Sequence, residues 1–325
     1  MKRRKVLASA GAAIAAAALP QLSLAQSASK AFDRPIQLIV PFAAGGSTDV
    51  TARALAKAAE PLLGQTVVIQ NKPGAAGAIA LAELKNAPAD GLTVAVFTAA
   101  AATVSPQIRK VGYSALTDFE PFMNYGMFSS YIAVAADGPY KTIEDLLEDI
   151  RRRPGQVVIG TTGHGSIGHL AGARLMEAKG LKAEFAAYAG GSKIVPALLG
   201  KHLGVAILGG EVAPHVHSGK IKLLLSMTEA QLKDLPGIPP MKSIGVPWTV
   251  ESWIALAVRK GTPPARLAAL EAAFQSAAKT DEFLATMEKL ATIVDIRNGS
   301  ETVQLLNRTY QENGRLVQAL GLAEK

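Results

Sequence analysis

The feature that most limits the possible folds is a regular alternation of short β-branched runs with alanine-rich helical patterns. Strands are predicted at residues 36–40, 66–70 and 92–98, and helices at residues 48–63 and 77–86 between them. Strands that alternate with helices in this way favour a mostly parallel sheet with helices on both faces. The first hundred residues after the N-terminal segment therefore predict an α/β unit.

A second α/β series follows, and at 325 residues the chain is long enough for about two domains. The predicted strands of this series are residues 131–135, 157–161, 183–188, 205–208 and 223–226, and its predicted helices are residues 143–153, 166–179 and 192–199.

The remaining elements contain too little sheet for a third domain. They are a long apolar strand at residues 252–258, helices at 263–279, 281–290 and 301–320, and a strand at 292–296. We expect this segment to return to the first unit.

That return predicts one lobe from residues 26–127 plus 253–325 and a second from residues 128–252. The chain would cross between the lobes near residues 125–130 and 250–254. Two crossings make a hinge and leave a cleft between the lobes.

The N-terminus has the pattern of a secretory signal peptide. Four cations, at residues 2–5, precede an apolar run over residues 6–19, and the small-x-small triplet at 23–25 is typical of a cleavage site. We therefore predict a signal peptide at residues 1–25 and export of the mature chain. The pair Arg3 and Arg4 resembles a twin-arginine export signal, although the motif is incomplete.

Composition argues against several other classes of function. The formal charge of +8 falls to +4 without the four N-terminal cations, and the remainder is spread along the chain, so we expect no nucleic-acid partner. The run of arginines at 151–153 is interpreted as the end of a helix, where cations complement the helix dipole. The chain has no cysteine, which excludes disulfides, thiolate zinc sites and a cysteine nucleophile.

Three glycine-rich loops, each between a strand and a helix, are the candidate binding elements. The first, at residues 41–49 (PFAAGGSTD), places two glycines before a helix whose free N–H groups form a small anion site. The same loop is also compatible with an ordinary strand-to-helix turn in which Asp49 pairs with Arg53. The third loop is residues 188–192 (YAGGS). Ligands of α/β sheets bind along the edge where such loops gather.

The second loop, at residues 163–169 (GHGSIGH), has two interpretations. It contains G-x-G-x-x-G, and Glu184 follows at about the distance where a dinucleotide fold places its ribose-binding acid. An exported dinucleotide-dependent oxidoreductase is therefore the alternative function. However, Glu184 falls near the start of its strand. The other interpretation directs N–H groups, Ser166 and His169 at a small carboxylate.

Signals for catalysis and for metal binding are weak. Ser166 lacks the flanking glycines of a nucleophile elbow, because His164 stands two residues before it. His215 and His217 have no evident third ligand partner. We therefore predict no catalytic residue, no metal and no cofactor.

In these loops and beyond, the sequence resembles the substrate-binding proteins of tripartite tricarboxylate transporters, also called the Bug family. The matching segments are residues 34–36, 40–49, 52–53, 71–77, 90–93, 165–172, Tyr188 with 190–191, 197–200, 219–220 and 252–253, and they occur in order along nearly the whole chain.

The resemblance implies a two-lobed periplasmic binding protein of type II, not an enzyme. Such a receptor closes on a small carboxylate, such as a di- or tricarboxylate, an aromatic acid or an acidic amino acid, and delivers it to a membrane transporter. A monomer is expected. A ligand sensor for a two-component system, touching a sensor kinase, stays open as a variant.

The resemblance also assigns ligand-binding roles. The residues implied by the first two loops are Phe42, Ala44, Gly45, Gly46, Ser47, Asp49, Thr162, Gly163, Ser166 and His169. Four further residues are implied to face the same space, namely Ala76, Thr98, Tyr188 and Gly210.

The sequence also departs from the pattern of the family at Ala189, His164, Ala173 and residues 208–211 (LGGE). These departures leave the loops that would bind the carboxylate unchanged. They leave open which residues contact the other half of the ligand.

Overall fold

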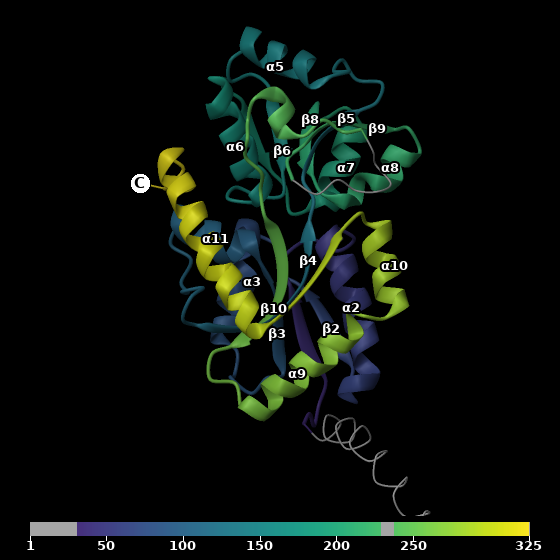
Figure 1. Ribbon diagram of the computed structural model, residues 1–325, viewed down its shortest axis with the longest axis vertical. Coiled ribbons are helices and arrows are strands. Elements are labelled where there is room, and N and C mark those ends of the chain that lie inside the picture. Colours follow the sequence, from purple (N-terminus) through teal and green to yellow (C-terminus); the bar gives the residue numbers. More distant parts are fainter. Residues whose placement is uncertain (1–30, 229–236, 325) are drawn as a thin grey trace, which may run out of the picture.

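The computed structural model describes residues 31–228 and 237–324, which form two α/β lobes, one above the other in Figure 1. The first lobe is built on a six-stranded sheet and the second on a five-stranded sheet. The predicted signal peptide and the arginine pair within it lie outside the described residues. No helix among the described residues is both long enough and apolar enough to cross a membrane.

The sheet of the first lobe has the strand order β11-β4-β10-β3-β1-β2. Its strands are β1 (Ile36–Val40), β2 (Val67–Asn71), β3 (Thr93–Thr98), β4 (Phe119–Phe128), β10 (Ser252–Arg259) and β11 (Ile293–Asn298). The two late strands, β10 and β11, pair with β3 and β4, so the C-terminal segment returns to the first sheet.

The sheet of the second lobe has the order β7-β6-β8-β5-β9. Its strands are β5 (Tyr131–Ala135), β6 (Val158–Thr161), β7 (Glu184–Ala187), β8 (Val205–Leu208) and β9 (Ile221–Ser226).

The α/β class is confirmed, but both sheets are mixed, whereas mostly parallel sheets were expected. β1 pairs in parallel with β2 and β3, while β10 runs antiparallel to β3 and β4. In the second lobe β5 runs antiparallel to β8 and β9. The reason is the double crossing, because the chain leaves the first lobe along β4 and returns along β10 in the opposite direction.

Strand β4 was not predicted from the sequence. It contains Pro121 and the buried polar residue Asn124, which interrupt the apolar alternation that identifies strands. Asn124 donates a hydrogen bond to the backbone oxygen of Asp295 in the neighbouring strand β11 at 2.6 Å. Only Ser129 and Ser130 separate β4 from β5 at the first crossing.

Helices cover both sheets, and those predicted from the sequence lie close to their predicted positions (Figure 1). The helices of four or more residues are α2 (Ser47–Leu63), α3 (Ala78–Asn86), α4 (Ser105–Ile108), α5 (Ile143–Arg152), α6 (Ile167–Lys179), α7 (Gly191–Leu199), α8 (Ala213–His217), α9 (Pro264–Ala277), α10 (Asp281–Lys289) and α11 (Gly299–Ala319), with the π-helix η2 (Ala100–Val104) and the 3-10 helix η4 (Met241–Ile244). Two single 3-10 turns are η1 (Ala75–Gly77) and η3 (Gly210–Val212). Four short helices, α4, α8, η2 and η4, were not predicted from the sequence.

Helix α5 shows how local sequence fixes an element. Thr142 accepts a hydrogen bond from the N–H of Asp145, and the Asp145 carboxylate accepts one from the N–H of Thr142, which forms a capping box. At the other end, Arg152 and Arg153 pair with Asp149. The arginine run is therefore a helix end that carries its own counter-charge.

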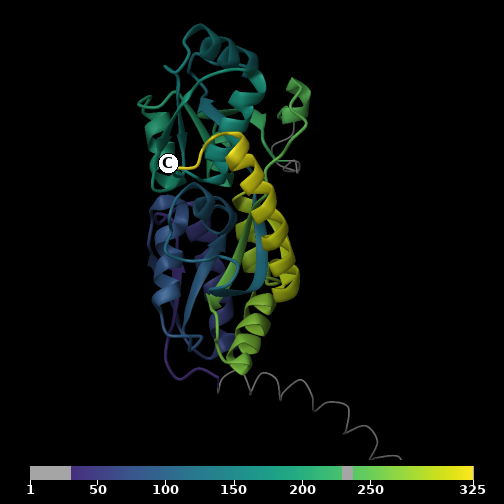
Figure 2. The same cartoon turned by 90° about the vertical axis from the view of Figure 1, so that its left-hand side faces the viewer.

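The C-terminal helices pack on the first lobe. Helices α9 and α10 contact α2, and α11 contacts β4 and η2. Figure 2 shows that α11 is long enough to continue beside the second lobe. The lobe limits proposed from the sequence, at residues 127/128 and 252/253, stay a prediction.

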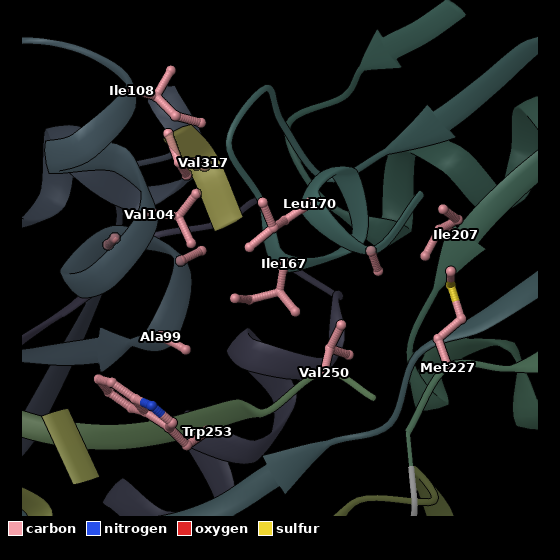
Figure 3. Packing of buried hydrophobic residues seen from close by; sticks show 14 of the residues in the cluster. Ala99, Val104, Ile108, Ile167, Leu170, Ile207, Met227, Val250, Trp253 and Val317 are labelled. Atoms are coloured by element: carbon pink, nitrogen blue, oxygen red, sulfur yellow. The ribbon is translucent and has the colours of Figure 1, made fainter. Parts of the chain in front are cut away.

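An apolar cluster crosses the boundary between the lobes (Figure 3). Ile167 and Leu170 of α6 in the second lobe lie beside Val104, Ile108 and Val317 of the first. All five side chains are at most 5% exposed. The two lobes therefore meet along a buried apolar contact, which borders the site described next.

Candidate ligand-binding site

A cavity of about 80 Å³ lies between the lobes, where the loops that follow their strands meet. The polar side chains that line it are Ser47, Thr48, Thr98, Ser129, Ser130, Thr162, Ser166, Glu211 and Ser252. Its apolar and backbone walls come from Phe42, Gly46, Ala100, Phe128, Ile167, Gly168, Gly190, Gly191, Ile207, Leu208 and Gly209. No lysine or arginine is among the lining residues that the structure describes, so its donors are hydroxyl and backbone groups.

The first glycine loop, which connects β1 to α2, is held in shape by Asp49. The Asp49 carboxylate accepts hydrogen bonds from the Gly45 N–H at 2.9 Å, from Arg53 Nε at 3.0 Å and from Asn71 Nδ2 at 2.8 Å. Gly45 has a φ of 81°, which favours glycine. With all these partners, Asp49 shapes the loop and does not line the cavity.

The surroundings of Asp49 favour its ionised form. Burial by itself would raise the pKa of this carboxyl, but the hydrogen bonds from Arg53, from the Gly45 N–H and from Asn71 together hold its pKa below the ordinary value. The Gly46 N-cap, which has no side chain, leaves the first N–H groups of α2 without a side-chain cap. These groups are therefore available to an anion at the cavity.

The second glycine loop, which connects β6 to α6, is fixed by Ser166 and His169. Ser166 Oγ caps α6 by accepting a hydrogen bond from the His169 N–H at 3.1 Å. The Gly165 N–H donates to His169 Nδ1 at 3.2 Å, so the neutral ring carries its proton on Nε2. Ser166 is 1% exposed and lines the cavity, whereas His169 lies behind the loop.

The His169 imidazole is neutral at physiological pH. Burial, and to a smaller extent the nearby His164 and Arg109, lower its pKa to about 4. Its ring packs against Phe185 with centroids 4.9 Å apart and against His164 at 4.4 Å. His169 therefore acts as a packed support for the loop and as an acceptor for its backbone.

The third loop, which connects β7 to α7, meets the first loop across the boundary between the lobes. The Ala43 N–H donates to the Ala189 oxygen at 3.0 Å, and Ser192 Oγ donates to the Ala44 oxygen at 3.0 Å. Tyr188 does not reach the cavity, because it lines a separate hollow of the second lobe beside Tyr140 and His202.

The structure brings six of the residues predicted for the site to the cavity wall, namely Phe42, Gly46, Ser47, Thr98, Thr162 and Ser166. The other eight do not line it and are Ala44, Gly45, Asp49, Ala76, Gly163, His169, Tyr188 and Gly210. Most of these eight belong to the loops that position the wall. Direct contact of any of the fourteen with a ligand stays a prediction.

Two of the eight are places where the lobes approach each other closely. A Cβ on Gly163, which has a φ of 132°, would lie 3.2 Å from the backbone nitrogen of Ala76. A Cβ on Gly210 would collide with the carbonyl oxygen of Leu290. Glycine is required at both positions by the contact between the lobes.

Sequence reasoning missed Glu211, the one titratable side chain among the described lining residues. Its carboxylate accepts a hydrogen bond from Ser47 Oγ of the opposite lobe. The signal was present, because Gly209 and Gly210 follow strand β8 just as the other glycine pairs follow their strands. The serines at the first crossing, Ser129 and Ser130, were missed for a different reason, since β4 was not predicted.

Two α/β lobes joined by two crossings, with strand-end loops around a small polar cavity, define a two-lobed solute-binding receptor. The model of the tripartite tricarboxylate transporter family receptor matches residues 51–322. The chain belongs to this family, so it is a periplasmic solute-binding receptor, and the family is one of receptors rather than enzymes.

Individual relatives agree with this assignment. The chain is 30% identical over 326 residues to the UPF0065 protein in the gbd 5' region of Cupriavidus necator, covering all of this chain and 99% of the relative. It is 32% identical to the protein BugT of Bordetella pertussis, over 78% of this chain and 80% of BugT. The solved structure of the periplasmic binding protein BugD is 28% identical, with a TM-score of 0.86 over 90% of this chain and all of that one.

Proposed function

We propose that this receptor closes on a small carboxylate and delivers it to a tripartite tricarboxylate-type transporter. The observation that supports this most directly is the donor set of the cavity. The start of α2 and the capped start of α6 face it from opposite lobes, and Thr98, Thr162 and Ser166 add hydroxyl groups, while the Ser47 hydroxyl donates to Glu211. Helix starts and hydroxyls stabilise an anion without a buried cation.

Related structures support a carboxylate as the ligand. The R. palustris protein Rpa4515 was solved with adipate, and MatC from Rhodopseudomonas palustris was solved with bound malate. These proteins are 24% and 22% identical to this chain, with TM-scores of 0.84 and 0.83. Both ligands are small carboxylates, which agrees with the donor set of the cavity.

The strength of such a site is sufficient for a receptor. A micromolar dissociation constant corresponds to about 8 kcal/mol. Hydrogen bonds to a charged group contribute roughly 1.5–3 kcal/mol each, and binding entropy and closure subtract several kcal/mol. Four to six aligned donors therefore suffice.

The mechanism follows from the division of the wall between two lobes. A ligand that touches both lobes binds the joined state better than the separated one, so it shifts the population toward closure. The joined state is the one that presents a new surface to a membrane partner. Delivery then requires that the partner favours separation of the lobes again.

The packing of the second glycine loop counts against the dinucleotide alternative. The loop at residues 163–168 packs against Ala76 and Ile108 of the first lobe, so a bulky pyrophosphate would have to separate the lobes.

A thermal-shift screen tests the proposal. The mature chain is melted with mono-, di- and tricarboxylates, aromatic acids and amino acids, each beside its neutral amide. At one hundred times the dissociation constant a ligand stabilises the fold by about 2.7 kcal/mol. We expect at least one carboxylate, and not its fully neutral amide, to raise the Tm. A rise with NADH and with no carboxylate would overturn the proposal.

The partner is tested separately. Membrane vesicles that contain the transporter subunits should take up the labelled ligand only when the receptor is added. Uptake without the receptor, together with receptor-dependent stimulation of a sensor kinase, would assign this chain to signalling instead.

A further inference from the structure

Within the proposed site, one wall carries a negative charge that belongs to the protein itself. Glu211 lies in the 3-10 turn η3, directly after the glycine pair that ends β8. It is half-buried and lines the cavity. A carboxylate receptor with a carboxylate in its own wall has to avoid placing the two negative charges side by side.

The Glu211 carboxylate is held in a defined place. It accepts a hydrogen bond from Ser47 Oγ, which belongs to the opposite lobe. A Cβ added to Gly191, the first residue of α7, would collide with Glu211 Oε1, and a Cβ on Gly209 would lie 3.0 Å from Oε2. Two glycines thus leave the space that the carboxylate fills, beside the start of a helix, where a negative charge is stabilised.

The position of the backbone of Glu211 is also fixed. Its neighbour Gly210 lies against the carbonyl oxygen of Leu290 in the first lobe, with no room for a side chain. Turn η3 is therefore seated against the first lobe, and the side chain of Glu211 extends from it toward Ser47. The contact between the lobes itself directs this carboxylate at the cavity.

No cation balances this charge in the part of the chain that the structure describes. Glu211 is in none of the ion pairs formed there by lysine, arginine or histidine within 4.0 Å. Its polar contact across the cavity is a single hydroxyl, which leaves acceptor capacity free. A partly desolvated carboxylate gains most from a positively charged or N–H donor partner.

We propose that Glu211 is the specificity-determining residue of this receptor, and that it selects solutes carrying one carboxylate and, at the far end, an ammonium group or another nitrogen donor. The solute carboxylate binds at the start of α6, where Thr162 and Ser166 line the cavity. The nitrogen group faces Glu211, which lies beside the start of α2 and is hydrogen-bonded to Ser47. A second carboxylate at that end meets like charge and is rejected. The inference rests on the proposed function and gives its ligand class.

Matched ligands test it. Malonate, succinate and glutarate are compared with their monoamides and with the ω-amino acids of the same chain length, by calorimetry on the mature chain and on Glu211→Gln. For the wild type we expect an ω-amino acid to bind at least tenfold more tightly than the dicarboxylate of its length, with the monoamide between them. In Glu211→Gln the dicarboxylate should gain at least tenfold and the ω-amino acid should lose at least tenfold.

The control is Glu184→Gln, which removes an exposed carboxylate from the same lobe, outside the cavity. It should leave every affinity unchanged. The Tm of each variant without ligand confirms that it is folded, and Glu211→Asp, which keeps the charge on a shorter side chain, should keep the preference for the nitrogen compound.

The outcomes separate the two proposals. If dicarboxylates bind the wild type as tightly as the ω-amino acids, and Glu211→Gln changes both equally, the role of Glu211 is overturned while the carboxylate receptor stands. If no carboxylate in the series or in the wider screen binds either protein, the proposed function falls, and this inference falls with it.

Discussion

The two walls of the cavity differ in charge. One wall is formed by the starts of α2 and α6 and offers hydroxyl groups and backbone N–H groups without a charged side chain. The other is formed by the start of α7 and by turn η3, and it presents the carboxylate of Glu211. Under the two proposals above, binding the carboxylate of the solute and selecting the group at its other end are separate tasks of different loops.

A negative charge introduced into the uncharged wall should have the largest effect on ligand affinity. Ser166→Asp keeps an oxygen that can cap α6 but places a negative charge beside the bound carboxylate. Like charges in contact cost several kcal/mol, so we expect affinity for any carboxylate to fall on the order of 1,000-fold, measured by calorimetry, while the Tm without ligand hardly changes.

Ser166→Asn is the matched variant, because it caps the helix without a charge. It should bind far better than Ser166→Asp. Equal losses in the two variants would mean that the wall discriminates by shape and not by charge.

The next largest effect is expected on the stability of the fold at low pH, through His169, which supports the loop of the uncharged wall. His169 has a pKa of about 4 in the folded chain and near 6.5 when unfolded. Between these values the unfolded chain binds a proton that the folded chain does not, so stability falls as the pH drops from 6.5 toward 4. The loss attributable to His169 is up to about 3 kcal/mol.

Urea unfolding of the wild type and of His169→Gln at pH 7.5 and pH 4.5 measures it. The glutamine can accept the hydrogen bond from Gly165 but does not titrate, so its stability should depend less on pH. The same pH dependence in both proteins would contradict the assignment of a neutral buried imidazole.

A smaller effect on ligand affinity is expected at Ser47, where the uncharged wall contacts Glu211. Ser47→Ala removes a hydroxyl that lines the cavity and that donates to Glu211. This hydrogen bond joins the two lobes, and one hydrogen bond to a charged group contributes about 1.5 kcal/mol or more, so its loss should disfavour closure and lower carboxylate affinity about tenfold. Ser47→Thr retains the hydroxyl and should bind nearly as the wild type does; a full loss in this variant would assign the effect to packing.

The smallest effect is expected from a substitution that displaces the Glu211 carboxylate without replacing Glu211 itself. Gly191→Ala pushes a methyl group into the space of the Glu211 carboxylate, which must then swing away. We expect the ratio of the affinity for the ω-amino acid to that for the dicarboxylate to fall about threefold, which corresponds to roughly 0.6 kcal/mol. Gly204→Ala is the control, since its Cβ would meet only Tyr140, at 4.0 Å. An unaltered preference in Gly191→Ala would show that the carboxylate has no fixed place.

Much of the architecture was readable in the sequence because it is encoded locally. The strand at 36–40, the glycine pair after it and the helix from Ser47 follow from residues that are neighbours in the chain. The capping box of α5, formed by Thr142 and Asp145, likewise involves residues that are neighbours in the chain. The family followed from motifs of the same local kind.

The failures also have a physical pattern. Strand β4 carries Pro121 and Asn124, which its neighbours in the sheet accommodate, so no local pattern identifies it. Tyr188 was assigned to the cavity because its loop was, but the side chain of a residue at the end of a strand can point to either face.

By itself, the sequence determined the α/β class, the glycine loops at the ends of strands and the family, since each depends on short-range periodicity, turn chemistry or a run of motifs. Only the tertiary structure decided which loop ends share a cavity. Ser47 and Glu211 are 164 residues apart and meet because two crossings fold one lobe onto the other. A contact of that kind depends on how whole sheets pack, which no local pattern encodes.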